Sequence, residues 1–186
     1  MCGQDVEALD CGPEASEWLE TNLGTPGLKL VRGVKRQSKT NDGSLSLSND
    51  SSCLLLNVSS IEQLRQVITR KCKQMGESSE EFTIDNLTQR FRGNIIIRGA
   101  PAFTEENWTK VHYNPFNFEV LGACKRCKMI SIEQSSGETT SEPLRSLALM
   151  KNRNFNFGIH TKPTMNNGAL ALENIVVNFG DSLKIK

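Results

Sequence analysis

The stretch Cys53-Leu54-Leu55-Leu56-Asn57-Val58 decides the fold, because it is a short and continuous run of mainly apolar residues. Such a run is typical of a strand that is buried in a sheet. The next residues, Ser59-Ser60-Ile61-Glu62, match a capping box, in which a serine and a glutamate three residues later satisfy each other's backbone amides. Apolar side chains then recur at helical spacing, which predicts a helix from about residue 60 to residue 74.

The chain before this strand is more polar. Residues 1–9 are expected to form a flexible tail, and Pro13 predicts the start of a helix that Gly24 ends. Alternating residues at 28–32 then predict a short strand. Two stretches rich in polar residues, near 35–52 and 75–82, are expected to be mobile surface loops.

The second half of the chain favours β-structure. Turn residues separate five apolar segments that predict strands, at residues 91–98, 116–120, 125–132, 155–159 and 183–185. Pro143 begins a short predicted helix that includes Leu147. The fold class predicted from this order is α+β, a mostly antiparallel β-barrel with a few peripheral helices, in a single domain over residues 10–186.

Composition excludes several classes of protein. The chain has 186 residues and a formal net charge of +1, which argues against a protein that is held on nucleic acid by bulk electrostatics. No window reaches 18 consecutive apolar residues, so no membrane span is expected. The chain starts without a basic segment or an apolar run, and its 6 cysteines are therefore expected to be reduced thiols in the cytoplasm.

Arg90, Arg92 and Asn94 alternate along the strand predicted at 91–98 and would share one face of it. Arginine binds phosphate through two parallel hydrogen bonds, and asparagine offers both a donor and an acceptor to a heterocycle. This face is therefore a candidate anion site. A solvated outer face of a barrel explains the same pattern equally well.

The segment Cys124-Lys125-Arg126-Cys127-Lys128 permits three interpretations. Half of a zinc site is disfavoured, because the chain has no second pair of cysteines with this spacing and because residues three apart in a strand face opposite sides. An inert buried cysteine is common. We favour a single reactive cysteine, since the flanking positive charge stabilises the thiolate, but the residue types do not indicate which of the two cysteines it is.

Together these segments resemble the MOSC domain, and most closely the C-terminal domain of eukaryotic molybdenum cofactor sulfurases. The resemblance rests on Arg90-Phe91-Arg92-Gly93-Asn94, on Gly122 to Ile130 with its two cysteines, and on the order and spacing of these two elements. It extends over residues 10–186, and includes Phe103 to Trp108 and Glu142-Pro143-Leu144.

The resemblance implies a MOSC-type barrel that binds the molybdenum cofactor, molybdopterin. It implies that Cys127 is the catalytic residue and the ligand of molybdenum. It assigns pterin and phosphate contacts to Arg90, Arg92 and Asn94, and the remaining predicted cofactor-binding residues are Lys125, Arg126, Ser59 and Ser60. The two serines are placed there because an oxyanion can bind the free amides at a helix N-terminus.

The implied function is to hold the cofactor, or its sulfurated form, for the sulfur transfer that activates xanthine dehydrogenase and aldehyde oxidase. Pyridoxal phosphate is not expected on this chain, because that cofactor belongs to a cysteine desulfurase region that complete sulfurases carry elsewhere. Two alternatives stay open: a molybdenum oxidoreductase of the amidoxime-reducing type, with Cys127 as a permanent metal ligand, and a non-catalytic cofactor carrier.

Overall fold

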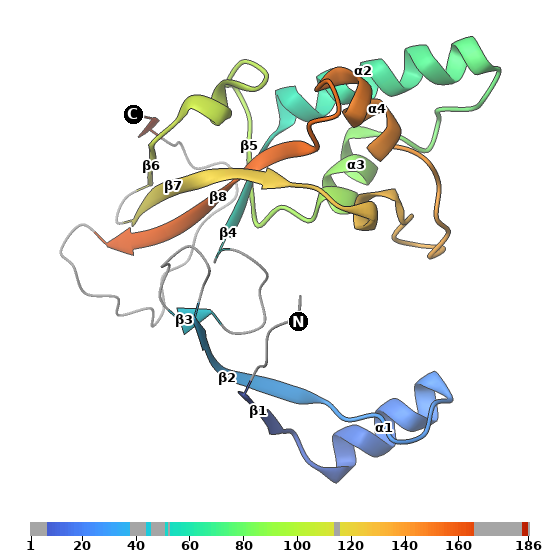
Figure 1. Cartoon of the computed structure of the whole chain (residues 1–186), viewed down its shortest axis with the longest axis vertical. Coiled ribbons are helices and arrows are strands. Elements are labelled where there is room, and N and C mark those ends of the chain that lie inside the picture. Colours follow the sequence, from blue (N-terminus) through green and yellow to red (C-terminus); the bar gives the residue numbers. More distant parts are fainter. Residues whose placement is uncertain are drawn as a thin grey trace. The chain divides into compact units, whose positions relative to one another are not determined.

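The computed structural model describes residues 7–37, 44–45, 51, 53–113, 116–165 and 184–185. The chain divides after Ser52 into two compact units, each described here by itself (Figure 1). That residues 10–186 act as one domain stays a prediction. In the described ranges, no helix combines the length and the apolar character needed to cross a membrane.

In the N-terminal unit, the described residues form one helix and a small sheet. α1 spans Pro13–Leu23, with proline in its first turn and Gly24 as its left-handed cap, which confirms the predicted helix. β1 (Glu7–Asp10) pairs antiparallel with β2 (Val31–Gln37), and β2 pairs with β3 (Ser44–Leu45). Residues 7–9, expected in a flexible tail, therefore form most of β1. The strand predicted at 28–32 is found as β2, which begins three residues later than predicted and extends to Gln37. Residues 1–6 lie outside the described residues.

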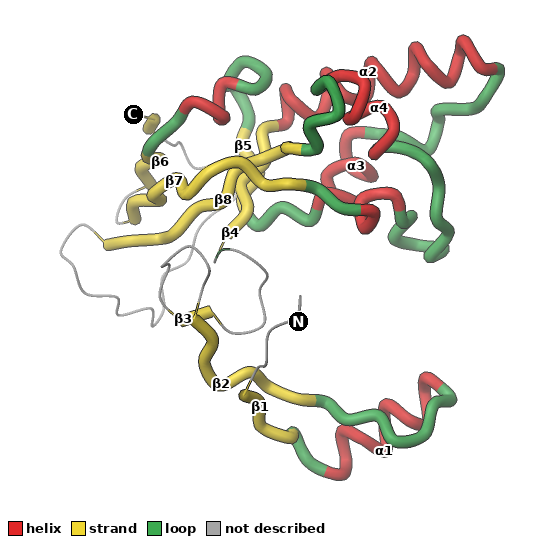
Figure 2. The backbone as a smooth tube through the Cα atoms, in the orientation of Figure 1, coloured by secondary structure: helices red, strands yellow, loops and turns green. Residues whose placement is uncertain are grey.

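The second unit is built on a six-stranded sheet with the order β5-β4-β8-β7-β6-β9 (Figure 2). Its strands, in chain order, are β4 (Cys53–Asn57), β5 (Ile95–Ile97), β6 (Lys110–Tyr113), β7 (Phe116–Lys125), β8 (Asn156–Met165) and β9 (Lys184–Ile185). β4 and β5 are parallel, and the other four pairs are antiparallel.

The predicted α+β class is confirmed, but the predicted barrel is not closed. The sheet is curled and mixed, with β5 and β9 at the two ends of the strand order. The parallel pair has a physical cause: the chain between β4 and β5 passes through α2 (Val58–Met75) and α3 (Ile84–Phe91), and such a crossover returns the next strand in the same direction. The predicted loop at 75–82 follows α2, and α4 (Leu144–Met150) confirms the short helix predicted at Pro143.

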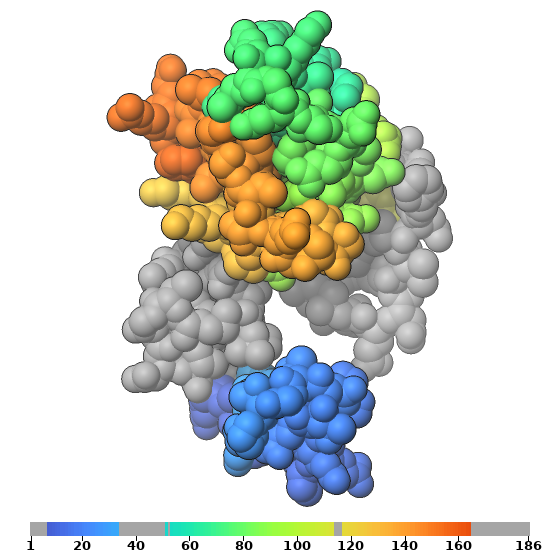
Figure 3. Space-filling view, turned by 90° about the vertical axis from the view of Figure 1, so that its right-hand side faces the viewer, coloured from blue at the N-terminus to red at the C-terminus, as the bar shows by residue number. Residues whose placement is uncertain are grey.

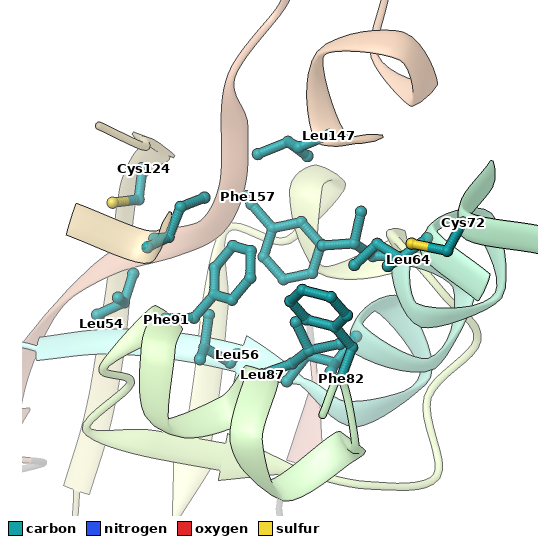
Figure 4. Packing of buried hydrophobic residues seen from close by; sticks show 13 residues of the cluster. Leu54, Leu56, Leu64, Cys72, Phe82, Leu87, Phe91, Cys124, Leu147 and Phe157 are labelled. Atoms are coloured by element: carbon teal, nitrogen blue, oxygen red, sulfur yellow. The ribbon is translucent and has the colours of Figure 1, made fainter. Parts of the chain in front are cut away.

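The alternation of side chains along β4 divides the core in two. Leu54 and Leu56 join a cluster that contains Phe91, Cys124 and Phe157 together with apolar residues of α2, α3 and α4 (Figure 4). Leu55 points to the opposite face and packs with residues of β5, β6, β7 and β8. This strand is buried on both faces, as its apolar run predicts.

The helix that follows β4 starts differently from the capping-box prediction. Its N-cap is Asn57, whose side chain accepts a hydrogen bond from the Ser59 amide at 3.1 Å. Glu62 binds Arg65 with Oε2–Nε 2.7 Å. The serine capping box is therefore wrong, because the last strand residue already supplies the cap that a serine would supply.

Two irregularities bend the β7–β8 pair near its end. The register shifts between Val120 and Gly122, and again between Ala123 and Lys125. The second shift lies beside Gly158, which has a φ of 76° and whose missing Cβ would lie 2.8 Å from the Leu55 carbonyl oxygen. Bulges of this kind redirect the side chains beside them. Here the second irregularity contains Cys124, and both irregularities come before Cys127.

Replacing Gly158 with alanine is expected to lower the free energy of unfolding by about 3 kcal/mol or more, because a left-handed conformation and a backbone clash add. Gly122→Ala is the matched control: its φ is 135° but its Cβ would meet nothing within 4 Å, so only the conformational cost of about 1–3 kcal/mol applies. Urea denaturation of both variants measures the difference. An equal loss of unfolding free energy in the two variants would show that β8 moves away from β4 at residue 158, so that no backbone clash arises.

Candidate functional site

The end of β7 presents its two cysteines in opposite environments. Cys124 is buried with 6% of its surface exposed, whereas Cys127 is exposed. The two thiols therefore lie in different surroundings, and the exclusion of a shared metal ion stays a prediction. The strand predicted over 125–132 is wrong beyond Lys125, because Lys128–Ser131 forms a 3-10 helix, η2, that turns Ile130 into the core.

The strand predicted at 91–98 is also wrong over its first half. Residues up to Phe91 belong to α3, which Thr83 caps by accepting a hydrogen bond from the Asn86 amide at 3.1 Å. Only Ile95–Ile97 is a strand. Leu87, Arg90 and Phe91 lie at helical spacing and are buried, and this burial determines the helical conformation. Arg90, Arg92 and Asn94 consequently do not share a strand face.

Arg90 is fully buried inside the protein. Its Nε donates to Asn86 Oδ1 at 2.7 Å, and its Nη2 pairs with Glu81 Oε2 at 3.0 Å. The guanidinium carbon lies 5.2 Å from the centre of the Phe82 ring. Its Nη1 is buried and has no hydrogen-bond partner among the described residues. In the structure Arg90 thus ties α3 to the loop that precedes it, away from solvent.

Arg92 and Asn94 occupy the turn between α3 and β5. Arg92 caps α3 in a left-handed conformation with φ 54°, and its side chain is exposed. Asn94 Oδ1 accepts a hydrogen bond from the Leu54 amide at 2.8 Å, and the Asn94 amide donates to the Leu54 carbonyl at 2.8 Å. The two hydrogen bonds of Asn94 therefore attach the turn between α3 and β5 to Leu54 of β4. Arg92 is the residue of this turn that presents a charge to solvent.

Arg126 joins the two segments that carry the family resemblance. Its Nη2 donates to the Phe91 carbonyl at 2.6 Å, and its Nη1 donates to Cys124 Sγ at 3.0 Å. Its backbone amide donates to the Phe155 carbonyl at 2.8 Å. The η2 region and α3 lie against each other in the space-filling view (Figure 3). Both terminal nitrogens of Arg126 are thus engaged inside the protein.

Ser59 and Ser60 lie in the first turn of α2 but have different surroundings. The Ser60 hydroxyl donates to Glu105 Oε1 at 2.6 Å and accepts from the Phe103 amide at 2.8 Å, and both Ser60 and Glu105 are buried. Asn57 Nδ2 donates to the other oxygen of Glu105 at 2.9 Å. Ser59 is half-buried and lines a hollow of about 470 Å³ on the surface of α2 and α3. Ser60 therefore serves the packing of the 101–107 segment.

Sequence reasoning missed one cation at this end of the sheet. Arg153 is exposed, has a φ of 64°, and precedes by two residues the Phe155 carbonyl that binds the Arg126 amide. Arg92 follows directly on Phe91, whose carbonyl binds the Arg126 side chain. Only the pairing of β7 with β8, which places Lys125 opposite Asn156, brings the chain after the residue 153 turn to Arg126, and no local motif marks it. The exposed cations of the three segments that meet at Arg126 are Arg92, Lys125, Lys128 and Arg153.

Two titratable groups near these segments have shifted pKa values. Hydrogen bonds from the Ser135 side chain and the Ser136 amide lower the pKa of Glu133 to about 2, so this carboxylate is charged within the turn after η2. Burial, followed by the charge of Glu142, raises the pKa of the Cys72 thiol. Cys72 is therefore an inert thiol of the core.

The side chains that could act as metal ligands indicate which kind of metal centre could bind here. The described part of the chain contains no group of three or more His, Cys, Asp or Glu side chains that could hold a metal ion. A bare ion would need such a group, whereas a metal that arrives with an organic ligand needs one protein thiolate at most. An exposed thiol in a cationic setting fits an anionic, metal-bearing cofactor.

Comparison with known proteins agrees with this chemistry. The MOSC domain family matches residues 42–184. Molybdenum cofactor sulfurase 2 of Culex quinquefasciatus is 36% identical over 163 residues, 86% of this chain and 21% of its own length. The sulfurases of Bos taurus and Homo sapiens are 35% and 34% identical and are covered over 20% and 19% of their lengths, with 88% and 86% of this chain aligned.

The chain spans about a fifth of the length of these curated relatives. The family match includes β4 to β8, the first residue of β9 and the three segments that meet at Arg126. Because the family matches residues 42–184, this chain belongs to the MOSC domain family, and it is similar over most of its length to molybdenum cofactor sulfurases.

Proposed function

We propose that this chain is the cofactor-binding part of a molybdenum cofactor sulfurase. It holds the molybdenum cofactor, molybdopterin, for the sulfur transfer that activates xanthine dehydrogenase and aldehyde oxidase. The observation that carries the proposal is the exposed Cys127 thiol, presented among cations at the junction of the two segments that the family resemblance singles out.

Cys127 is the residue proposed to act on the cofactor. It is exposed, and it lies between Arg126, whose side chain binds inside the protein, and Ile130, which is 1% exposed. Anchors on both sides restrict the backbone that carries the thiol, and a restricted ligand loses less entropy on binding. A thiolate is also the ligand that soft metal centres and sulfane sulfur prefer.

The exposed cations are proposed to recognise the anionic end of the cofactor. Arg92 can donate two parallel hydrogen bonds to a phosphate, and Lys125 adds a positive charge on the solvent side of β7. The roles predicted for Arg90, Asn94 and Ser60 would require their internal contacts to be exchanged for cofactor contacts. We therefore place the main electrostatic recognition on Arg92 and Lys125.

The protein's own part in the chemistry is to bind and orient. When bound, the cofactor supplies the metal centre at which sulfur is accepted. Cys127 presents its sulfur to that centre, the exposed cations hold the anionic tail, and the core behind Cys124 excludes water from the inner side of the segment. Pyridoxal phosphate and the release of sulfur from cysteine are assigned to a separate desulfurase region. This chain is expected to act in the cytoplasm.

Substitution of Cys127 by serine is expected to abolish retention of molybdenum by the cofactor-loaded chain, because the oxygen is a poor ligand for a soft metal. Cys124→Ser is the matched control and should retain molybdenum, since the buried residue 124 faces the core. Elemental analysis after gel filtration measures the effect. Equal losses in the two variants would contradict the assignment to Cys127.

Replacing Arg92 with alanine is expected to weaken cofactor binding by about 1.5–3 kcal/mol, or roughly ten- to a hundredfold in Kd, the range for a hydrogen bond to a charged group. Arg70→Ala removes an exposed arginine from α2 and should leave the Kd unchanged. Titration of both variants with molybdopterin under anaerobic conditions gives the comparison. If Arg70 and Arg92 proved equivalent, general charge rather than this site would explain binding.

The amidoxime-reducing alternative is tested on the same loaded chain. Incubation with an electron donor and an N-hydroxylated substrate should give no turnover if the chain serves sulfur transfer. Efficient reduction that is lost in Cys127→Ser would instead identify a molybdenum oxidoreductase and overturn the sulfurase proposal.

A further inference from the structure

We propose that Arg126 is a positioning residue that determines which of the two cysteines is offered to the cofactor. It holds Cys124 in the core and leaves Cys127 as the thiol that faces solvent. The inference deepens the proposed function, since it rests on Cys127 as the thiol that meets the cofactor. Its physical content concerns the thiols alone and can be tested without any cofactor.

Three contacts fix Arg126 in place. Nη2 donates to the Phe91 carbonyl at 2.6 Å, Nη1 donates to Cys124 Sγ at 3.0 Å, and the backbone amide donates to the Phe155 carbonyl at 2.8 Å. The guanidinium carbon also lies 5.2 Å from the centre of the Phe91 ring. The side chain is therefore bound to α3, to β7 itself and to the residue that leads into β8.

The acceptor on α3 suits a cation. Phe91 is the last residue of α3, where carbonyl groups lack partners in the helix and the helix dipole places partial negative charge. A guanidinium can satisfy this carbonyl and the Cys124 sulfur at once, because its fork presents two donors in one plane. A lysine ammonium is a single point and cannot reproduce both contacts with the same geometry.

This anchor has a consequence for exposure, which alternates between successive side chains from Cys124 to Cys127. The Arg126 guanidinium lies against the buried Cys124 sulfur, whereas Lys125 and Cys127 on either side of residue 126 are exposed. Ile130 anchors the other side of Cys127, and its amide lies 3.4 Å from the Cys127 carbonyl oxygen. This role for Arg126 differs from the direct cofactor contact that the sequence suggests, because its two terminal nitrogens already bind protein atoms.

The test is alkylation of the folded chain with iodoacetamide, followed residue by residue by peptide mass spectrometry. In the unchanged chain Cys127 should react, and Cys124 and Cys72 should be protected by burial. In Arg126→Ala the rate at Cys124 should rise by about tenfold or more, and the preference for Cys127 should fall accordingly. Arg126→Lys should give an intermediate preference.

Cys72 separates positioning from a general loss of stability. It belongs to the same core cluster as Cys124 but comes from α2, so global unfolding exposes both thiols whereas loss of the anchor exposes Cys124 alone. Arg145→Ala is the matched control, since it removes an arginine that binds Glu142 and Glu77 within the fold. It should leave the Cys124 to Cys127 ratio unchanged.

An unchanged ratio in folded Arg126→Ala, or a rise at Cys72 equal to that at Cys124, would overturn the inference. If the alanine variant does not fold, Arg126→Lys carries the test, and a ratio in it identical to that of the unchanged chain has the same meaning. Either result concerns Arg126 only. The proposed function fails independently, if Cys127→Ser retains molybdenum.

Discussion

The contact between the Arg126 guanidinium and the Phe91 carbonyl joins segments 35 residues apart, and the geometry of the candidate site depends on it. It closes the C-terminal end of α3, covers the ring of Phe91 and turns the backbone so that the next cysteine faces outward. A charged donor on an unpaired helix carbonyl is among the stronger hydrogen bonds available within a protein. One side chain thereby links the packing of the core to the exposure of a thiol.

A second anchor fixes another connection of the same sheet. The Glu105 carboxylate is buried between Asn57 and Ser60, and its two oxygens accept hydrogen bonds of 2.9 Å and 2.6 Å from them. These bonds attach the segment after β5 to the junction of β4 and α2. Buried carboxylates are costly unless they are satisfied in this way. The site is thus carried by a sheet with two internally anchored connections rather than by an isolated loop.

Aromatic packing in the core connects these two anchors to the site. The Phe91 and Phe157 rings lie 4.4 Å apart between their centres, and Phe103 meets Phe157 edge-on at 6.0 Å. Phe157 follows directly on the start of β8, next to the bulge at Gly158. Because interiors are close-packed, a change of volume at these rings moves the strands that end beside Cys127. This explains why a site with one exposed thiol needs a large apolar support.

The amino-acid sequence alone determined the elements whose pattern is local. The buried strand at β4, the long amphipathic α2, the helix after Pro13 and the α+β class all follow from periodicity and from the Pro13 and Gly24 signals. The different exposure of Cys124 and Cys127 agrees with the expected opposite orientation, although the strand assumed for it ends at Lys125. The sequence did not determine the conformation of residues 84–92, because the apolar run at 95–97 extended a strand pattern over residues whose burial against α2 makes them helical. The tertiary structure likewise decided which cationic side chains face solvent. Arg90 and Arg126 differ from Arg92 and Arg153 only in whether folding supplies an internal acceptor for the guanidinium, and a sequence pattern does not record the distance to that acceptor.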